Sequence, residues 1–478
     1  MAVLPPEVAW HEDAAALAGG GTDGLGVVRQ VLAAAPALVV PGGDVWLEVD
    51  PSHPPLIRAA VEGGGGGGGL RWVASHLDFM GKDRFVHLRV EGEGAGAASG
   101  APATRELRRL AAYTPILPHT VVAASLGIPE ASIIKLDANE NPYGASAAAT
   151  AALAATPYLH VYPDPESRDL RSALAAYTGV DAAHILVGAG ADELIDLLFR
   201  LLVTPGAGDT VVNFPPTFGM YQFDADVNGA EVISLGRGGD CDAANGGLDG
   251  DFRVPIEAVE AVFARAAAGE CARPKMVFVA SPNNPDGSLL PDADLERLLA
   301  LPTLVVLDEA YMEFSGVDRA GLVPRHPNLV VLRTFSKWAG LAGLRVGYGL
   351  FPLGLMEHLW KCKQPYNVSV AAQAAATAAV QAASELAGQV AAMVAQRERF
   401  FVEAKALPWL TPYPSAANYV LCRVAEGGGR TARGVKEALF AQGILVRYYT
   451  SPGLSDCIRI SMGTPEQMDK VFSALAKL

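Results

Sequence analysis

Four apolar runs in the second part of the chain are each followed by residues that can do chemistry. The runs cover residues 184–188, 276–280, 304–307 and 329–333, and they lead into AGADE, SPNNPDG, DEAY and TFSK. Short apolar runs bounded by turn residues are typical of buried strands. Because ligands bind at the carboxyl ends of the strands in a parallel sheet, we expect these four ends to converge.

Lys337, in the last of these segments, carries an amine that can act as a nucleophile towards a carbonyl carbon. It follows the strand directly and precedes Gly340, Gly343 and Gly347, which indicates backbone that must pack closely. We therefore expect the amine to emerge at the active edge of the sheet. An isolated lysine in such a place is more often a solvated surface residue.

The segment Gly188 to Glu193 runs straight into an apolar pattern with helical spacing. Small residues at the start of a helix leave free N–H groups and the positive helix end available to a phosphate. A plain connection between a strand and a helix has the same composition, so this turn alone does not decide between the two.

Polar groups follow the other two strands. Asp308 closes a buried-looking strand, where a carboxylate is costly unless it is paired, so a protonated ring nitrogen is a sensible partner and a helix cap is the competing interpretation. Tyr311 lies on a similar side if a helix follows. Asn283 and Asn284 are typical of turns, but their amides can also donate to a phenolate oxygen.

The elements that must position these residues alternate between strands and longer helices from Arg105 onward. This order predicts an α/β fold with a mostly parallel sheet and helices on both faces. Before it, residues 23–40 have helical spacing, and residues 45–50 and 84–90 resemble strands. The stretch 91–104 is small and flexible and reads as a linker.

Composition excludes several classes of protein. Every apolar run is interrupted well before the roughly 18 residues that span a bilayer, so we expect no membrane segment. The net charge is −14 and no basic block is present, which argues against nucleic acid as a partner. The five cysteines are odd in number and widely spaced and the histidines are scattered, so neither a disulfide framework nor a metal site is expected.

Taken together and in this order, the motifs of residues 105–478 resemble the histidinol-phosphate aminotransferases, which have the aspartate-aminotransferase-like fold (fold type I). The resemblance is carried by LDANENPYG (136–144), YPDPES (162–167), GAGADELIDL (188–197), PPTFGMYQFDADVNGA (215–230), SPNNPDG (281–287), LDEAYMEFSG (307–316), TFSKWAGLAGLRVGYG (334–349), QPYNVSVAAQ (364–373) and IRISMGTPEQ (458–467).

The resemblance implies pyridoxal 5'-phosphate as the cofactor and a role for each matched residue. Lys337 would bind it covalently and later move a proton between the substrate carbon and the cofactor. The ring would contact Asp308 at its nitrogen, Asn284 and Tyr311 at its phenolic oxygen, and Phe218 on its face. The phosphate would be held by the backbone of Ala191, Asp192 and Glu193, by Ser336 and Arg345, and by Tyr162 of the other subunit of a homodimer.

The same resemblance implies small-molecule substrates, namely histidinol phosphate and glutamate, which share one anion pocket. Arg447 and Arg459 would receive the anion, with Tyr113 closing the pocket and Asn418 nearby. Asp286 stands where many bacterial members have threonine, a change that plant-like members tolerate. The similarity to plant and algal members suggests a plastid location, although no transit peptide is visible.

The expected domains are an N-terminal arm with part of a small domain (105–160), a large cofactor-binding domain (161–400) and a C-terminal small domain (401–478). Residues 5–91 resemble the carboxyl-terminal part of the release-factor glutamine methyltransferases, so we expect residues 1–90 to form an incomplete methyltransferase-like segment. The glycine-rich loop for S-adenosylmethionine and the Asn-Pro-Pro-Tyr segment of that family are both missing. We therefore assign no methylation.

Two alternatives stay open at this stage. A related aminotransferase would use the same chemistry on aromatic amino acids or on another phosphorylated amine such as threonine phosphate. A binding or regulatory protein with an inactive second part would bind no coloured cofactor, and substitution of Lys337 would change nothing.

Overall fold

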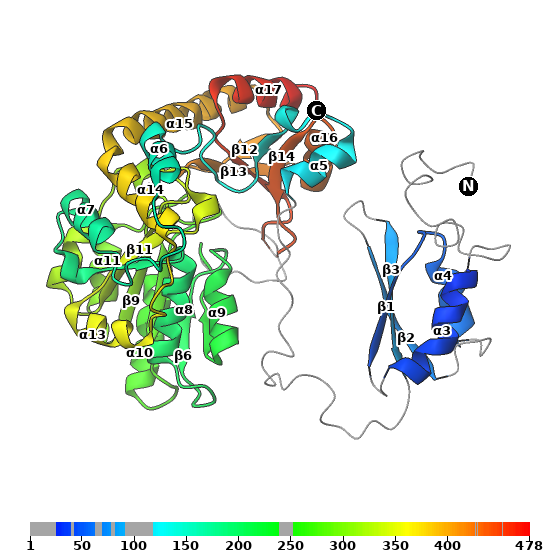
Figure 1. Cartoon of the computed structure of the whole chain (residues 1–478), viewed down its shortest axis with the longest axis horizontal. Coiled ribbons are helices and arrows are strands. Elements are labelled where there is room, and N and C mark those ends of the chain that lie inside the picture. The colour runs from blue at the N-terminus through cyan, green and yellow to red at the C-terminus, as the bar shows by residue number, and fades with distance from the viewer. Residues whose placement is uncertain are drawn as a thin grey trace. The chain divides into compact units, whose positions relative to one another are not determined.

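The computed structural model describes residues 25–39, 43–62, 69–77, 82–90, 118–238, 252–425, 427, 429–451 and 453–478 of the chain. Its contacts form two compact units, Met1–Arg108 and Arg109–Leu478 (Figure 1). The expected linker, residues 91–104, lies outside the described residues. The boundaries expected at residues 160 and 400 stay predictions.

The first unit contains a three-stranded antiparallel sheet with the strand order β1-β3-β2. Its elements are α3 (Gly26–Leu38), β1 (Asp44–Glu48), α4 (Pro54–Glu62), β2 (Leu70–Leu77) and β3 (Asp83–Val90). Both helices lie on the same side of the sheet (Figure 1), and Leu32, Ile57 and Leu88 belong to the apolar cluster between them. The helix and two strands expected from the sequence are confirmed, whereas α4 and β2 were not expected.

The large sheet of the second unit has seven strands, all parallel except β11. In spatial order they are β5 (Ile185–Gly188), β11 (Gly347–Leu350), β10 (Leu329–Thr334), β9 (Leu304–Asp308), β8 (Met276–Ala280), β6 (Thr210–Asn213) and β7 (Glu231–Ser234). The mostly parallel sheet predicted from the sequence is therefore present.

Alternate residues of these strands enter two separate apolar clusters, one on each face of the sheet. In β9, for example, Val305 and Leu307 belong to one cluster while Val306 belongs to the other. The first face packs against α7 (Arg168–Thr178), α10 (Ile256–Ala267) and α11 (Asp292–Leu299), and the second against α8 (Ala191–Leu202), α9 (Met220–Asn228) and α13 (Leu353–Cys362). Burial on both faces explains why the strands read as unbroken apolar runs.

A smaller sheet of five strands forms the rest of the unit's β-structure. Its order is β12 (Leu410–Pro412), β13 (Tyr419–Val424), β15 (Cys457–Ser461), β14 (Ile444–Tyr448) and β4 (Ile134–Leu136). The edge strand β4 comes from the start of the unit and pairs in parallel with β14. This pairing brings the segment that follows β4 towards strands more than 300 residues later in the chain.

The remaining helices complete the unit. They are α5 (His119–Leu126), α6 (Ala147–Ala155), α12 (Met312–Ser315), α14 (Val370–Gln381), α15 (Ala383–Glu403), α16 (Ala432–Phe440) and α17 (Pro465–Leu475). Figure 1 shows α15, α16 and α17 around the small sheet. None of the helices that the structure describes combines the length and apolar character needed to cross a membrane.

Candidate active site

A cavity of about 930 Å³ lies where the ends of the large-sheet strands meet the small sheet. Of the residues predicted for the site, those that line it are Ala191, Asp192, Phe218, Asn284, Asp308, Tyr311, Ser336, Lys337, Arg345, Arg447 and Arg459. The expected convergence of the four strand ends is therefore confirmed, because each of them contributes to this list. Neighbouring parallel strands end at one edge of a sheet, and this edge holds the cavity.

Lys337 projects from the segment after β10 into this cavity. Its Nζ donates a hydrogen bond to the backbone oxygen of Ala138, at a distance of 3.0 Å. Burial, together with the nearby guanidinium of Arg459, lowers the pKa of Lys337 to about 8. Near neutral pH a useful fraction of the amine is therefore uncharged, which is the nucleophilic form.

Asp308 is the last residue of β9, where the ladders place it beside Ala280 and Leu332. Its carboxylate accepts hydrogen bonds from the hydroxyl of Tyr221 at 2.6 Å and from the backbone N–H of Ala310 at 3.0 Å. Burial raises the pKa of Asp308 to about 6, against the opposing effect of the Tyr221 hydrogen bond. A buried carboxylate of this kind favours a cationic partner.

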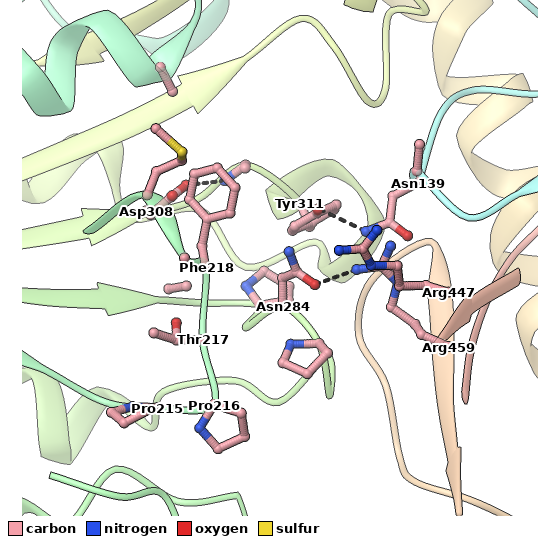
Figure 2. A pocket seen from close by; sticks show the side chains of 18 of the residues that line it. Asn139, Pro215, Pro216, Thr217, Phe218, Asn284, Asp308, Tyr311, Arg447 and Arg459 are labelled. Carbon is pink, nitrogen blue, oxygen red and sulfur yellow. Dashed lines mark hydrogen bonds between the residues drawn. The ribbon is translucent and has the colours of Figure 1, made fainter. Parts of the chain in front are cut away.

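Two aromatic residues near the start of α9, Phe218 and Tyr221, lie close to Asp308. Figure 2 shows the Phe218 ring beside Asp308, and the two aromatic rings of this segment meet edge to face with centroids 5.6 Å apart. Tyr221 was not predicted as a site residue. Its position three residues after Phe218, just inside a helix, was the available indication that both side chains lie on one side.

Replacing Tyr221 with phenylalanine is expected to weaken cofactor binding by roughly 10- to 100-fold, because a hydrogen bond to a charged group contributes about 1.5–3 kcal/mol. Without the hydroxyl, the ionised form of Asp308 loses one of its two described donors. The measurement is the dissociation constant of pyridoxal 5'-phosphate for the apo-protein. Tyr413→Phe is the matched control, since that buried hydroxyl has no hydrogen-bond partner among the described residues and does not line the cavity. Equal affinity in Y221F and wild type would contradict the prediction.

The start of α8 forms a second part of the cavity wall. Its cap Gly190 has a φ of 82°, and a side chain there would come within 2.8 Å of Nη2 of Arg345. At Gly347 a Cβ atom would come within 2.7 Å of the backbone nitrogen of Ala191. These two glycines therefore let β11 and Arg345 approach the positive end of the helix, as a phosphate site requires.

The side chains around this helix end are those expected to hold an anion. Arg345 donates to the carboxylate of Asp192 at 2.7 Å, and the Ser336 hydroxyl lies 3.0 Å from the Thr334 hydroxyl.

Gly340 also packs tightly, against the backbone oxygen of Gly144. Gly343 was expected to do the same, but nothing lies within 4 Å of its Cβ position, so this expectation was wrong.

Two arginines from the small sheet face the opposite end of the cavity (Figure 2). Arg459 donates to the side chain of Asn284 and, at 2.7 Å, to the backbone oxygen of Asp137. Arg447 lies opposite Arg459 in the ladder between β14 and β15. Two guanidinium groups at one end of a cavity are suited to a phosphate or a carboxylate.

Some predicted residues lie elsewhere. Glu193 and Asn418 do not line the cavity: Glu193 accepts from Ala189 and Asn367, and Asn418 donates to the backbone oxygen of Asn139. Tyr162 is 77% exposed and its ring stacks on that of Tyr366. Tyr113 lies outside the described residues.

Asp286 does not line the cavity either. Its carboxylate accepts from the side chain of Asn283 and from the backbone N–H of Ser288, so it shapes the loop that presents Asn284. The change from threonine at this position therefore alters the support of the loop, and not the cavity wall.

Comparisons with known proteins agree with this geometry. Residues 131–475 match the family "Aminotransferase class I and II". The chain is 49% identical over 370 residues to histidinol-phosphate aminotransferase 1, chloroplastic, of Arabidopsis thaliana. The aligned region covers 77% of this chain and 84% of that protein. It is 47% identical to histidinol-phosphate aminotransferase of Roseiflexus castenholzii, covering 78% of this chain and 97% of that protein.

A solved structure is similar as well. The crystal structure of histidinol-phosphate aminotransferase from Sinorhizobium meliloti in complex with pyridoxal-5'-phosphate superimposes with a TM-score of 0.67 at 28% identity. The match covers 80% of this chain and 98% of that one.

Proposed function

This chain belongs to the histidinol-phosphate aminotransferases of the class I and II aminotransferase family, and we infer that it transfers the amino group of L-glutamate to imidazole acetol phosphate. The products are L-histidinol phosphate and 2-oxoglutarate, and the reaction is a step of histidine biosynthesis. The observation that carries this inference is one cavity holding a lysine with a lowered pKa, a buried aspartate and a pair of arginines.

Pyridoxal 5'-phosphate fits the groups that line the cavity. Asp308 would pair with its ring nitrogen, Phe218 would cover the ring, and Asn284 and Tyr311 would contact the phenolic oxygen. The phosphate would lie at the start of α8 with Ser336 and Arg345, where Gly190 and Gly347 let Arg345 and β11 approach the helix end. When bound, the cofactor withdraws electrons from the substrate carbon.

Lys337 would supply the amine that holds the cofactor and, once released, the base that moves the substrate proton. Its lowered pKa suits both roles, because a general base works best when its pKa lies near the working pH. The oxygen of Ala138 gives the released amine a fixed hydrogen-bond acceptor. That acceptor would hold the free amine inside the cavity between the two half-reactions.

The arginine pair would receive the phosphate of histidinol phosphate in one half-reaction and a carboxylate of glutamate in the other. The alternative substrate is an aromatic amino acid or another phosphorylated amine, bound through the same arginines. Turnover of histidinol phosphate compared with phenylalanine, under identical conditions, tests the assignment. A preference for phenylalanine would overturn the substrate and leave the aminotransferase chemistry standing.

Arg459→Lys is expected to raise KM for histidinol phosphate by roughly 10- to 100-fold, since hydrogen bonds to charged groups contribute about 1.5–3 kcal/mol. Lysine keeps the positive charge but loses the planar fork and the bonds to Asn284 and Asp137. Arg447→Lys should act in the same direction. Initial rates at varied substrate measure the effect. Arg423→Lys is the control, because this arginine pairs with Asp456 and does not line the cavity. A KM equal to that of wild type would contradict the prediction.

We also propose a homodimer in the plastid, with no nucleic-acid or membrane partner. The exposed aromatic pair of Tyr162 and Tyr366 supports a subunit contact, because large exposed rings are costly in a monomer. The acidic net charge disfavours nucleic acid. The chloroplastic relatives support the location, although a bacterial relative is nearly as similar.

For the first unit we propose descent from the carboxyl-terminal part of a release-factor glutamine methyltransferase without its activity. The three-stranded sheet with two helices on one side is what a fragment of a larger α/β sheet would form. The sequence lacks both segments that such an enzyme needs at its active site.

A further inference from the structure

The segment Asp137–Ala138–Asn139, directly after β4, is hydrogen-bonded to two side chains that line the cavity and to a third that does not. Its three successive backbone oxygens accept hydrogen bonds from Arg459, Lys337 and Asn418, in that order. The distances are 2.7, 3.0 and 3.0 Å. A short stretch of backbone thus joins the anion pocket to the reactive amine.

Asn139 is the centre of this arrangement. Its side chain is 1% exposed and its φ is 56°, in the left-handed region that asparagine tolerates better than most residues. Its amide nitrogen donates to the hydroxyl of Tyr311 at 2.9 Å, as the dashed line in Figure 2 shows. Its amide oxygen accepts from the hydroxyl of Ser461 at 2.8 Å.

Ser461 determines which way the Asn139 amide faces. The serine hydroxyl already accepts from the backbone N–H of Asn139 at 3.0 Å, so its own proton is left to donate. Ser461 donates this proton to the amide oxygen of Asn139, and the NH₂ group of the same amide therefore faces Tyr311. Because the phenol oxygen of Tyr311 accepts this bond, its proton remains available to an acceptor in the cavity.

The same serine also orients the oxygen that holds Lys337. In a trans peptide the N–H and C=O groups point in opposite directions. Ser461 holds the N–H of the peptide between Ala138 and Asn139, and the C=O of that peptide accepts from Lys337. Ser461 therefore helps to orient both the oxygen that accepts from the Lys337 amine and the amide that donates to the Tyr311 phenol.

We propose that Asn139, anchored by Ser461, is a positioning residue that directs the phenol proton of Tyr311 to the cofactor's ring oxygen and the Ala138 oxygen to Lys337. This proposal rests on the proposed function, because that function assigns Tyr311 to the ring oxygen. Burial raises the pKa of Tyr311 to about 12, so the phenol keeps its proton at working pH.

The test is Asn139→Gly in the full-length protein. Glycine adopts a positive φ readily, so the backbone is kept and only the amide is removed. A weaker donor to the ring oxygen disfavours the deprotonated form, so the pH midpoint of the visible absorbance of the bound cofactor should rise by about half to one unit. The dissociation constant of pyridoxal 5'-phosphate should rise by roughly 5-fold, as for one hydrogen bond.

Three further variants separate positioning from general damage. Tyr311→Phe should raise the midpoint at least as far, and the double variant N139G/Y311F should shift it no further than Y311F alone. Ser461→Ala should shift it in the same direction. Asn328→Gly is the matched control, because that amide donates to three backbone oxygens at the opposite end of β10 and should leave the midpoint unchanged.

The outcomes distinguish the two claims. A midpoint in N139G equal to that of N328G, or additive shifts in the double variant, would overturn the positioning role. A wild-type protein that binds no pyridoxal 5'-phosphate would instead overturn the proposed function itself.

Discussion

Lys337→Ala is expected to abolish amino transfer, with a loss of about 10⁴-fold or more in kcat, because one residue supplies both the attachment of the cofactor and the proton transfer. The purified variant should also lose the visible absorbance of covalently bound cofactor. Both effects are measured on the same preparation, by steady-state turnover of histidinol phosphate and by the absorption spectrum. The lysine is partly buried in the cavity wall, and nothing else among the described lining residues carries a primary amine.

Lys363→Ala is the matched control for this result. Lys363 is also buried, and burial lowers its pKa, but it donates to Gln364, Pro365 and Asn367 and does not line the cavity. We expect K363A to keep both colour and turnover. If K337A stayed yellow and active, Lys337 would not be the residue that anchors the cofactor. If instead the wild-type protein showed no colour and no turnover and K337A changed nothing, the chain would be better explained as a binding or regulatory protein whose second part is inactive.

Asp308→Asn is expected to lower kcat by about 10²- to 10³-fold, the range typical for loss of one preorganised electrostatic group. Asparagine keeps the shape of the side chain but cannot balance the positive charge of a protonated ring nitrogen. The cofactor would therefore withdraw electron density from the substrate less strongly. Steady-state rates with saturating substrates measure the loss.

Binding of the cofactor should also depend on pH through this residue. Burial raises the pKa of Asp308 to about 6 in the unliganded protein. Below that pH the carboxyl group is neutral and cannot pair with the ring, so affinity for pyridoxal 5'-phosphate should fall as the pH drops through about 6. In D308N this part of the pH dependence should be absent. The comparison is a titration of apo-protein at a series of pH values.

Asp224→Asn provides the control for both measurements. Asp224 is another buried acid whose pKa burial raises, to about 7, and it lies on α9 without lining the cavity. Removing its charge should leave kcat and the pH dependence of cofactor binding unchanged. If D308N behaved like D224N, Asp308 would have no electrostatic role.

Local patterns in the sequence determined a large part of this site. The ends of β5, β8, β9 and β10 were predicted from apolar runs and turn residues, because both signals arise within a few residues of each other. The order of the motifs then indicated the family and the cofactor. Lys337, Asp308 and Arg345 were chosen on that basis, and all of them line the cavity.

Only the tertiary structure decided which distant residues support those groups. The bond from Lys337 to Ala138 joins residues 199 positions apart, and Ser461 contacts Asn139 across 322 positions. Asn418, expected at the substrate, instead holds the backbone of Asn139. No periodicity or turn preference encodes such contacts, because they depend on how β4 pairs with β14 and how the small sheet then packs beside the cavity.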